Sequence, residues 1–151
     1  MKKALLALAM LVAFASASFA QNALGVRLGA GNGTNAELSY QMGMGSNRLE
    51  FDLGWAGHDN WAYYNISGIY QWTGTFTGPL GWYAGLGANL GLWSAKNNDS
   101  DFGLAIGGQA GLELNIIDPL QFTLDVRPMW NFIGHGAGFG WGAALGIRFK
   151  L

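Results

Sequence analysis

The sequence lacks several features on which most folds depend. It has no cysteine, three prolines among 151 residues, and 11 % charged residues. Soluble proteins carry roughly 25 % charged residues, so this chain has too little charge to coat a surface that faces water. The absence of cysteine excludes disulfides and thiolate metal sites. Beyond its N-terminus the sequence also has no apolar run of about 18 residues, which excludes a membrane-spanning helix.

Glycine and aromatic residues are present in excess. The 151 residues include 25 glycines, and 14 % of the residues are aromatic. Glycine averages about 7 % in proteins. A chain that is poor in charge, rich in aromatic residues and without a spanning helix is either a core without a surface or a β-barrel in a membrane.

Residues 1–20 have the pattern of a secretory signal peptide. A basic pair, Lys2 and Lys3, precedes an apolar segment and then small residues. This pattern predicts cleavage after residue 20 and a mature domain of residues 21–151. The apolar segment is too short for a retained anchor helix.

The predicted mature chain is slightly acidic. Removal of Lys2 and Lys3 leaves 8 − 2 = 6 basic residues against 9 acidic residues, a net charge of −3. A nucleic-acid-binding domain carries a basic footprint, so nucleic acid is not an expected partner.

The last stretch, residues 139–151, alternates between two kinds of side chain. Every second residue from Phe139 to Leu151 is apolar, and those between them are glycine, alanine, Arg148 and Lys150. A period of two is that of a β-strand with two different faces. Because a closed sheet must pair its last strand with its first, this ending predicts the seam of a barrel.

The same alternation recurs along the mature chain and predicts an all-β fold, an eight-stranded antiparallel up-and-down transmembrane β-barrel. Asp118-Pro119 is a tight-turn signal. Pro128 cannot donate to a ladder, so it predicts a bulge or the level at which its strand leaves the membrane. The expected strands are residues 24–30, 35–42, 48–55, 61–72, 82–92, 102–115, 120–127 and 139–151, and the expected connections include 43–47, 56–60 and 73–79.

The two alternating faces differ in size as well as in polarity. The apolar face holds the large side chains, whereas the polar face of several strands is mostly glycine and alanine. An eight-stranded barrel has room for only modest filling of its lumen. A soluble barrel with its apolar face inward would crowd the lumen and expose bare glycine to water. The sequence therefore favours large side chains that face lipid and small ones that face the lumen.

Ten charged residues share the polar face, five of each sign. Buried charges must be paired, so we expect an ion-pair and hydrogen-bond network that fills the lumen. The alternative is a narrow, porin-like polar channel for water or small ions, because glycines either accommodate long neighbouring side chains or leave a gap. The ten residues are Arg27, Glu37, Arg48, Glu50, Asp52, Glu113, Asp125, Arg127, Arg148 and Lys150, of which Arg48, Glu113, Arg148 and Lys150 are expected low in the lumen, toward the chain termini.

Aromatic residues gather toward both ends of the apolar face, as amphipathic rings do at two membrane interfaces. The predicted girdles are Trp55, Tyr64, Trp130, Phe139 and Trp141 at one end and Trp72, Trp82 and Phe149 at the other.

Together, the signal peptide, the eight alternating strands and the aromatic-containing last strand resemble the small outer-membrane β-barrel proteins of Gram-negative bacteria, of the outer membrane protein A and X type. The run Leu124-Asp125-Val126-Arg127-Pro128 is similar to the L-D-x-R-P segment in the penultimate strand of some of these barrels. Such proteins often end in Phe or Tyr, whereas Leu151 is last here. The resemblance implies export through the secretory pathway to the cell outer membrane. It also implies outer-membrane lipid, lipopolysaccharide and the barrel-insertion machinery as partners, and we expect a monomer.

No catalytic or metal-binding pattern stands out in the sequence. Some outer-membrane barrels of similar size act on lipid A with Ser, His and an acidic partner. The two histidines here, His58 and His135, lie in expected loops without a suitably spaced serine. Residues 97–101 lack the ligand spacing of a calcium loop. We therefore expect a structural or surface-interaction role without enzymatic activity, cofactor or metal, and short loops that offer at most a small epitope of His58, Trp61, Lys96 and Asp99.

Overall fold

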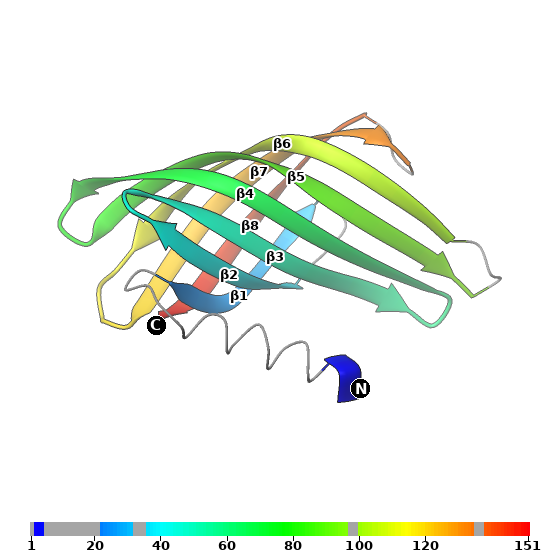
Figure 1. Ribbon diagram of the computed structural model, residues 1–151, viewed down its shortest axis with the longest axis horizontal. Coiled ribbons are helices and arrows are strands. Elements are labelled where there is room, and N and C mark those ends of the chain that lie inside the picture. The colour runs from blue at the N-terminus through cyan, green and yellow to red at the C-terminus, as the bar shows by residue number, and fades with distance from the viewer. Residues whose placement is uncertain (1, 5–21, 32–35, 97–99, 135–137) are drawn as a thin grey trace.

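Eight antiparallel strands follow one another around a closed barrel, each hydrogen-bonded to its neighbours (Figure 1). The computed structural model describes residues 2–4, 22–31, 36–96, 100–134 and 138–151, apart from the side chain of His58. The predicted eight-stranded up-and-down barrel is confirmed. The strands are β1 (Ala23–Gly31), β2 (Ala36–Met44), β3 (Asn47–His58), β4 (Trp61–Thr77), β5 (Leu80–Ala95), β6 (Ser100–Leu114), β7 (Leu120–Ile133) and β8 (Gly138–Lys150).

The predicted signal peptide, residues 1–20, lies outside the described residues except for residues 2–4, so its cleavage stays a prediction. In the part of the chain that the structure describes, no helix is long and apolar enough to cross a membrane.

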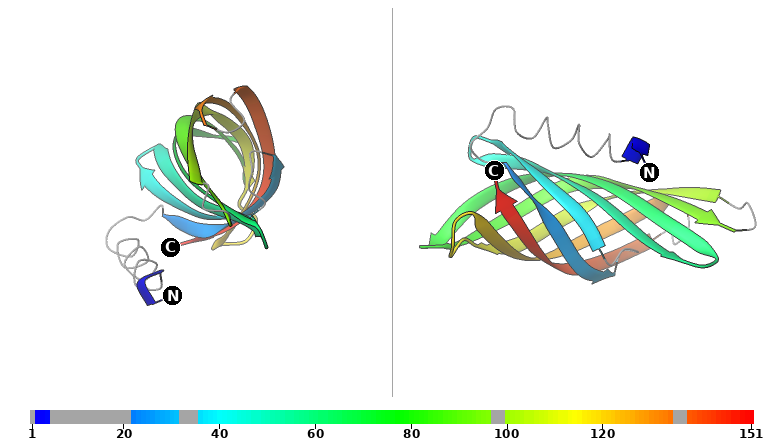
Figure 2. Two further views of the ribbon diagram at one scale, coloured as in Figure 1. Left: turned by 90° about the vertical axis from the view of Figure 1, so that its right-hand side faces the viewer. Right: turned by 90° about the horizontal axis from the view of Figure 1, so that it is seen from below.

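The first and last strands close the barrel, as the alternation of the last stretch predicts. β1 pairs with β8 along its whole length, ending at Gly31 opposite Gly142. Beyond that ladder, the backbone N–H of Leu151 donates to the carbonyl oxygen of Asn22 at 2.8 Å. The left view of Figure 2 shows the resulting ring of strands from one end. A closed ring leaves no unpaired sheet edge.

The barrel has two distinct ends. The terminal end holds residues 22 and 151 together with the turns that join β2 to β3, β4 to β5 and β6 to β7. The opposite, distal end holds the two-residue turn at 59–60 between β3 and β4. The turn at the terminal end of β6 contains a cis peptide bond between Asp118 and Pro119.

The strands extend further than the alternation predicts, so three expected connections are wrong. The expected connections 43–47, 56–60 and 73–79 are instead the two-residue turns 45–46, 59–60 and 78–79. Gly45 has a φ of 72° and Gly78 a φ of 50°. Two-residue hairpins need such positive φ values, and glycine adopts them without strain.

Residues 73–77 form part of a strand, although their sequence predicts a turn. They continue β4 opposite β5, with a register irregularity between Thr75 and Thr77. Threonine and aromatic residues favour strands, while the glycine among them looks like a turn residue. Gly74 instead lies under the indole of Trp82, which a Cβ at this position would overlap. Glycine at position 74 therefore serves the packing of the Trp82 indole.

Pro128 lies inside β7 without the predicted bulge, and the alternative, that it marks the level at which the strand leaves the membrane, stays a prediction. It stands opposite Trp141 of β8, in register with the residues on either side. The irregularity between β6 and β7 lies elsewhere, at 104–105. On the β6 side of Pro128 the paired residues skip from Gly107 to Ala110. The barrel thus accommodates the missing N–H by giving up local pairing on one side.

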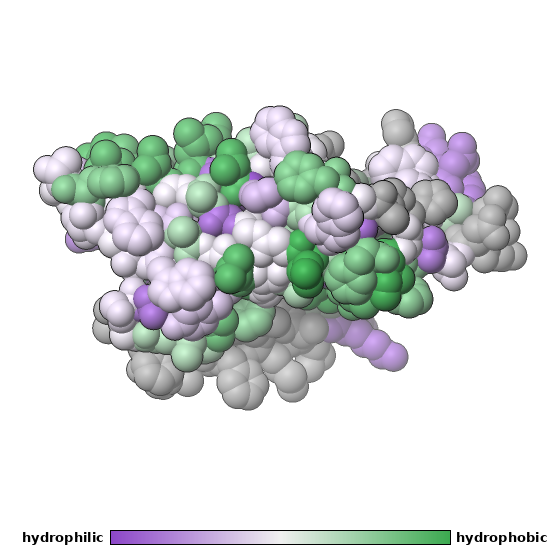
Figure 3. All heavy atoms as spheres, turned by 90° about the horizontal axis from the view of Figure 1, so that it is seen from above, coloured by the Kyte–Doolittle hydropathy of each residue, from purple (hydrophilic) through white to green (hydrophobic). Residues whose placement is uncertain are grey.

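Polar side chains face the lumen and large apolar ones face outward. Leu86, Phe139 and Leu145 are each more than 60 % exposed. Hydrophobic side chains cover much of the barrel face in Figure 3. A barrel with an apolar lumen is therefore excluded. The buried polar and charged residues are Asn22, Arg27, Glu37, Ser39, Gln41, Arg48, Glu50, Asp52, Asn65, Ser67, Gln71, Gln109, Gln121, Thr123, Asp125, Arg127 and Arg148.

Lumen-facing glycines make room for side chains of the neighbouring strand. A Cβ at Gly87 would overlap the carbonyl oxygen of Gly68 and lie 2.8 Å from both Cα and Cγ1 of Ile69. The glycine-lined wall of the lumen is thus covered by Ile69 at this position. The absence of a side chain at Gly87 also lets the backbones of β4 and β5 approach each other closely.

We predict that Gly87→Ala lowers the free energy of unfolding by about 2 kcal/mol, because the added methyl group overpacks two backbones. Gly68→Ala is the matched control on the adjacent strand, since its Cβ meets only the ring of Phe51 at 3.8 Å. This control should stay within about 0.5 kcal/mol of the native protein. Denaturant unfolding of the refolded barrels, followed by tryptophan fluorescence, measures both values. Equal stability of the two variants would contradict this account of the glycines.

Candidate functional site: a polar network across the lumen

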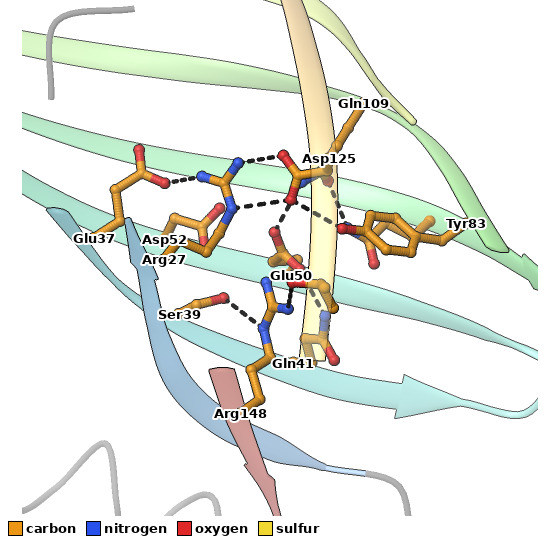
Figure 4. A network of polar contacts seen from close by, with 12 residues as sticks. Arg27, Glu37, Ser39, Gln41, Glu50, Asp52, Tyr83, Gln109, Asp125 and Arg148 are labelled. Carbon is orange, nitrogen blue, oxygen red and sulfur yellow. Dashed lines mark hydrogen bonds and ion pairs between the residues drawn. The ribbon is translucent and has the colours of Figure 1, made fainter. Parts of the chain in front are cut away.

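Polar side chains from all eight strands meet inside the barrel, and Figure 4 shows the central part of this network. Their period of two along each strand places them on the lumen side. The contributors are Arg27 of β1, Glu37, Ser39 and Gln41 of β2, Arg48, Glu50 and Asp52 of β3, Asn65 and Gln71 of β4, Tyr83 of β5, Gln109 and Glu113 of β6, Gln121, Thr123, Asp125 and Arg127 of β7, and Arg148 of β8.

Arg27 bridges two strands that lie on either side of the seam. Its guanidinium forms ion pairs with Glu37 of β2 and Asp125 of β7. The Asp125 carboxylate also accepts a hydrogen bond of 2.9 Å from the hydroxyl of Tyr83. The side chain of Arg27 is 6 % exposed and that of Asp125 is fully buried. Burial without these partners would be strongly unfavourable for either charge.

Arg127 reaches across the lumen to the opposite wall. Its Nη2 lies 2.5 Å from Oδ2 of Asp52 and 3.2 Å from Oε1 of Glu50, both on β3. β7 and β3 are four steps apart in a ring of eight strands, so they lie on opposite sides. Its Nη1 lies 3.5 Å from Oε2 of Glu37. This arginine therefore crosses the full width of the lumen.

Arg148 and Glu50 form a fully buried pair at the centre of the network. Arg148 Nη2 lies 2.9 Å from Glu50 Oε2, and both side chains have 0 % exposure. Arg148 also donates from Nε to Ser39 at 3.1 Å and from Nη1 to Thr123 at 2.9 Å. The sequence predicts Arg148 low in the lumen, but its long side chain extends to the carboxylate that Arg127 also contacts.

A second ion pair lies nearer the terminal end. Arg48 Nη1 contacts Glu113 Oε2 at 2.7 Å, which joins β3 to β6 across the lumen. Arg48 Nε donates to Gln71 at 2.5 Å. The guanidinium carbon lies 4.9 Å from the ring centroid of Tyr83, in cation–π geometry.

Neutral amides connect the two ion-pair clusters. Gln71 Nε2 donates to Gln109 Oε1 at 2.5 Å, and Gln109 Nε2 donates to Glu50 at 3.2 Å. Gln41 Nε2 donates to the same carboxylate at 2.7 Å. The polar contacts therefore run without a break from Glu37 to Glu113.

Nine of the ten predicted lumen charges meet in this network, and Lys150 does not. Its Nζ lies 3.4 Å from Oδ1 of Asp118, and the two side chains are 39 % and 87 % exposed. Lys150 is the last residue of β8, so it stands at the mouth of the terminal end. Its ion pair is a surface pair in the solvent.

The neutral residues of the network, Tyr83 and the glutamines among them, were not predicted as site residues. Tyr83 and the glutamines lie on the polar face, so the alternation carried a signal for them. Their role depends on which strand faces which across the lumen, and alternation does not contain that information. The ring of Tyr83 occupies the space that a Cβ at Gly111 would fill.

The predicted girdle residues lie on the outside of the barrel, toward its two ends. Trp55 stands opposite Tyr64, and Trp130 opposite Phe139, in the distal half. These side chains are 51 % to 66 % exposed. At the terminal end Trp82 is less exposed than the others because it packs on Gly74. Their place at membrane interfaces stays a prediction.

Two cavities flank the network. The distal cavity has a volume of about 520 Å³ and reaches the network at Glu37 and Arg127. The terminal cavity has a volume of about 420 Å³ and reaches the network at Arg48 and Glu113. The ion-pair network lies between the two cavities.

The structure leaves the expectation about catalysis untested. His135 and Asp99 lie outside the described residues, and the side chain of His58 is also not described. Among the residues that are described, no group of three or more His, Asp or Glu side chains is arranged to hold a metal ion.

The barrel is similar to the solved structure of Neisserial surface protein A. The two structures align with a TM-score of 0.65 at 12 % sequence identity, over 86 % of this chain and 96 % of the other. At this identity the likeness shows the shared barrel fold alone, and the predicted resemblance to small eight-stranded barrels is confirmed at that level. No protein-family model and no curated protein sequence matches the chain.

We predict that Arg148→Met lowers the free energy of unfolding by about 3 kcal/mol, because it leaves part of the buried charge of Glu50 uncompensated. Lys150→Met, two residues further along β8, removes only a surface ion pair and should change stability by less than about 1 kcal/mol. Denaturant midpoints of the two refolded variants compare them directly. A Lys150 variant as unstable as the Arg148 variant would show that lumen burial is not what distinguishes them.

Proposed function

We propose that this chain is an integral protein of the bacterial outer membrane whose lumen is sealed by its ion-pair network, with a structural or surface-interaction role. The observation that carries the proposal is the contact of 2.5 Å between Arg127 and Asp52. It joins strands on opposite sides of the barrel, so the lumen is blocked at that height.

The outward apolar face supports a membrane location. Leu28, Leu124 and Leu145 stand side by side on three adjacent strands and are 52 % to 63 % exposed. Exposed apolar area is unfavourable in water by about 25 cal/mol per Å². A closed sheet with such a belt satisfies its backbone internally, which is what a lipid environment requires.

A location in the outer membrane implies which molecules the protein would contact. The apolar belt would contact outer-membrane lipid and the lipid part of lipopolysaccharide, and insertion would require export and the barrel-insertion machinery. The terminal end would face the periplasm and the distal end the cell exterior. Because the outer face is complementary to lipid and each strand pairs within one chain, the proposed state is a monomer. The structural or surface-interaction role that we propose involves no enzymatic activity and no cofactor.

Ion conductance of the refolded chain, residues 21–151, in a planar lipid bilayer tests the seal. We predict a silent bilayer for the native protein, with a heat-sensitive gel shift to show that the barrel has folded. Discrete conductance steps from the native protein would instead favour the alternative, a narrow polar channel that connects the two cavities.

The double variant Asp52→Ser/Arg127→Ser should open the seal, because it removes both charges of the pair that crosses the lumen and leaves a gap. Arg27 and Arg148 still neutralise the remaining carboxylates, so the barrel should fold. Asp118→Ser/Lys150→Ser also removes an ion pair, but at the terminal mouth, and should remain silent. A folded Asp52/Arg127 variant that does not conduct would contradict the assignment of this pair as the seal.

A further inference from the structure

The distal cavity is lined by inward-facing aromatic and amide side chains, most of which take no part in the ion-pair network. Trp61 and Tyr63 of β4 and Trp93 of β5 lie on its wall, together with Asn65 and Asn89. Odd-numbered residues of β4 and β5 face the lumen, so these three aromatic rings are not part of the lipid-facing girdles. A cavity of about 520 Å³ falls within the range of small-molecule sites, roughly 300–1,000 Å³.

The three rings pack against one another on this wall. The ring centroids of Trp61 and Trp93 are 4.9 Å apart and their planes differ by 5°, which is a stacked pair. Tyr63 stands 6.0 Å from Trp93 at an angle of 51°. Gly91 supports this arrangement, since a Cβ there would lie 2.6 Å from the Tyr63 hydroxyl. The stacked indoles hold each other in place, and the rings that line the cavity offer it a rigid apolar surface.

Asparagine side chains from three strands are oriented beside this wall. Asn89 donates from Nδ2 to Ser67 at 2.7 Å, and Asn131 donates from Nδ2 to the carbonyl oxygen of Gly138 at 3.3 Å. Asn65 donates from Nδ2 to Glu37 at 3.3 Å. Each amide is thus fixed through its nitrogen.

Asn65 points to a ligand more directly than the other two amides. It is 2 % exposed, and its Oδ1 is buried without a hydrogen-bond partner among the described residues. Buried acceptors without a partner are rare in native structures and call for an explanation such as a ligand or an ordered water molecule. A ligand hydroxyl at the floor of the cavity would satisfy this oxygen after a small movement of the side chain.

The combination of groups selects a chemical class. Stacked rings 4.9 Å apart leave no gap for a cation, so the wall is not an aromatic cage for quaternary ammonium. Glu37 and Arg127, which form the floor, are already joined to each other in the network. A neutral ligand with one apolar face and several hydroxyls matches rigid aromatic rings next to fixed amides.

We propose that the distal cavity binds a neutral saccharide, with the C–H face of a pyranose ring against the tryptophan wall and its hydroxyls on Asn65, Asn89 and Asn131. A soluble oligosaccharide and the sugar part of lipopolysaccharide both present this chemistry, and the test below distinguishes the two sources. This inference does not depend on the seal: a barrel that conducts ions still has this wall.

Calorimetric titration of the refolded native protein in detergent micelles tests the proposal. The soluble probes are maltose, lactose and N,N′-diacetylchitobiose at millimolar concentration. The lipid-linked probe is lipopolysaccharide with its core sugars, compared with lipid A that lacks them. Saturable heat with at least one soluble probe, or with lipopolysaccharide but not lipid A, is the expected result and identifies the source. Silence with every probe, or equal binding of lipid A and lipopolysaccharide, would overturn the proposal.

Variants locate the site for whichever probe binds. Trp61→Leu and Asn65→Ala should each weaken binding at least tenfold, whereas Trp61→Phe keeps a flat ring and should weaken it less than Trp61→Leu. Trp55→Leu is the matched control, because Trp55 is also at the distal end but faces outward and is 51 % exposed. Its affinity should match that of the native protein. Equal affinity of the Trp61→Leu and Asn65→Ala variants and the control would place binding outside this cavity.

Discussion

The set of ion pairs inside the lumen is the interaction on which the rest of the structure depends. Arg127 and Arg148 join β7 and β8 to β3 across the lumen, and Arg27 pairs with Glu37 and Asp125 beside them. A charge that is buried without a partner is strongly unfavourable. The positions of Glu37, Glu50 and Asp125 on three separate strands therefore fix how those strands are arranged around the ring. Glycines on the facing strands supply the space that the long side chains need.

Alternation and side-chain size together were enough to predict the fold. A period of two defines eight strands and their two faces, and the limited room in the lumen indicates that the face with the small side chains is inside. The strand ends were harder to predict, because a glycine within a polar stretch indicates a turn, whereas Gly74 lies under Trp82 in a strand. The missing N–H of Pro128 predicts a bulge, but the ladder with β8 stays in register at this position. Tertiary pairing overrides local propensity at both positions.

The sequence predicted which charged residues belong to the site, but not which side chains contact one another. Nine of the ten charges meet because charges on the polar face have nowhere else to be neutralised. Lys150 differs because it lies at the mouth, where solvent screens it. The stack of Trp61 on Trp93 was not foreseen, because it depends on the register between β4 and β5. The described residues divide the lumen into an ion-paired centre and two cavities with different chemistry.

The proposed membrane location requires that the apolar face of this barrel contacts lipid. Leu145 tests this most directly, because it is 63 % exposed and lies midway along β8, between Leu28 and Leu124. The measurement is the free energy of unfolding of Leu145→Arg in lipid vesicles, with Leu151→Arg at the chain end as control. Lipid contact predicts a loss of about 2–4 kcal/mol for Leu145→Arg and at most about 1 kcal/mol for the control. A Leu145→Arg barrel within about 0.5 kcal/mol of the native protein would mean that this face is in water, and would contradict the account.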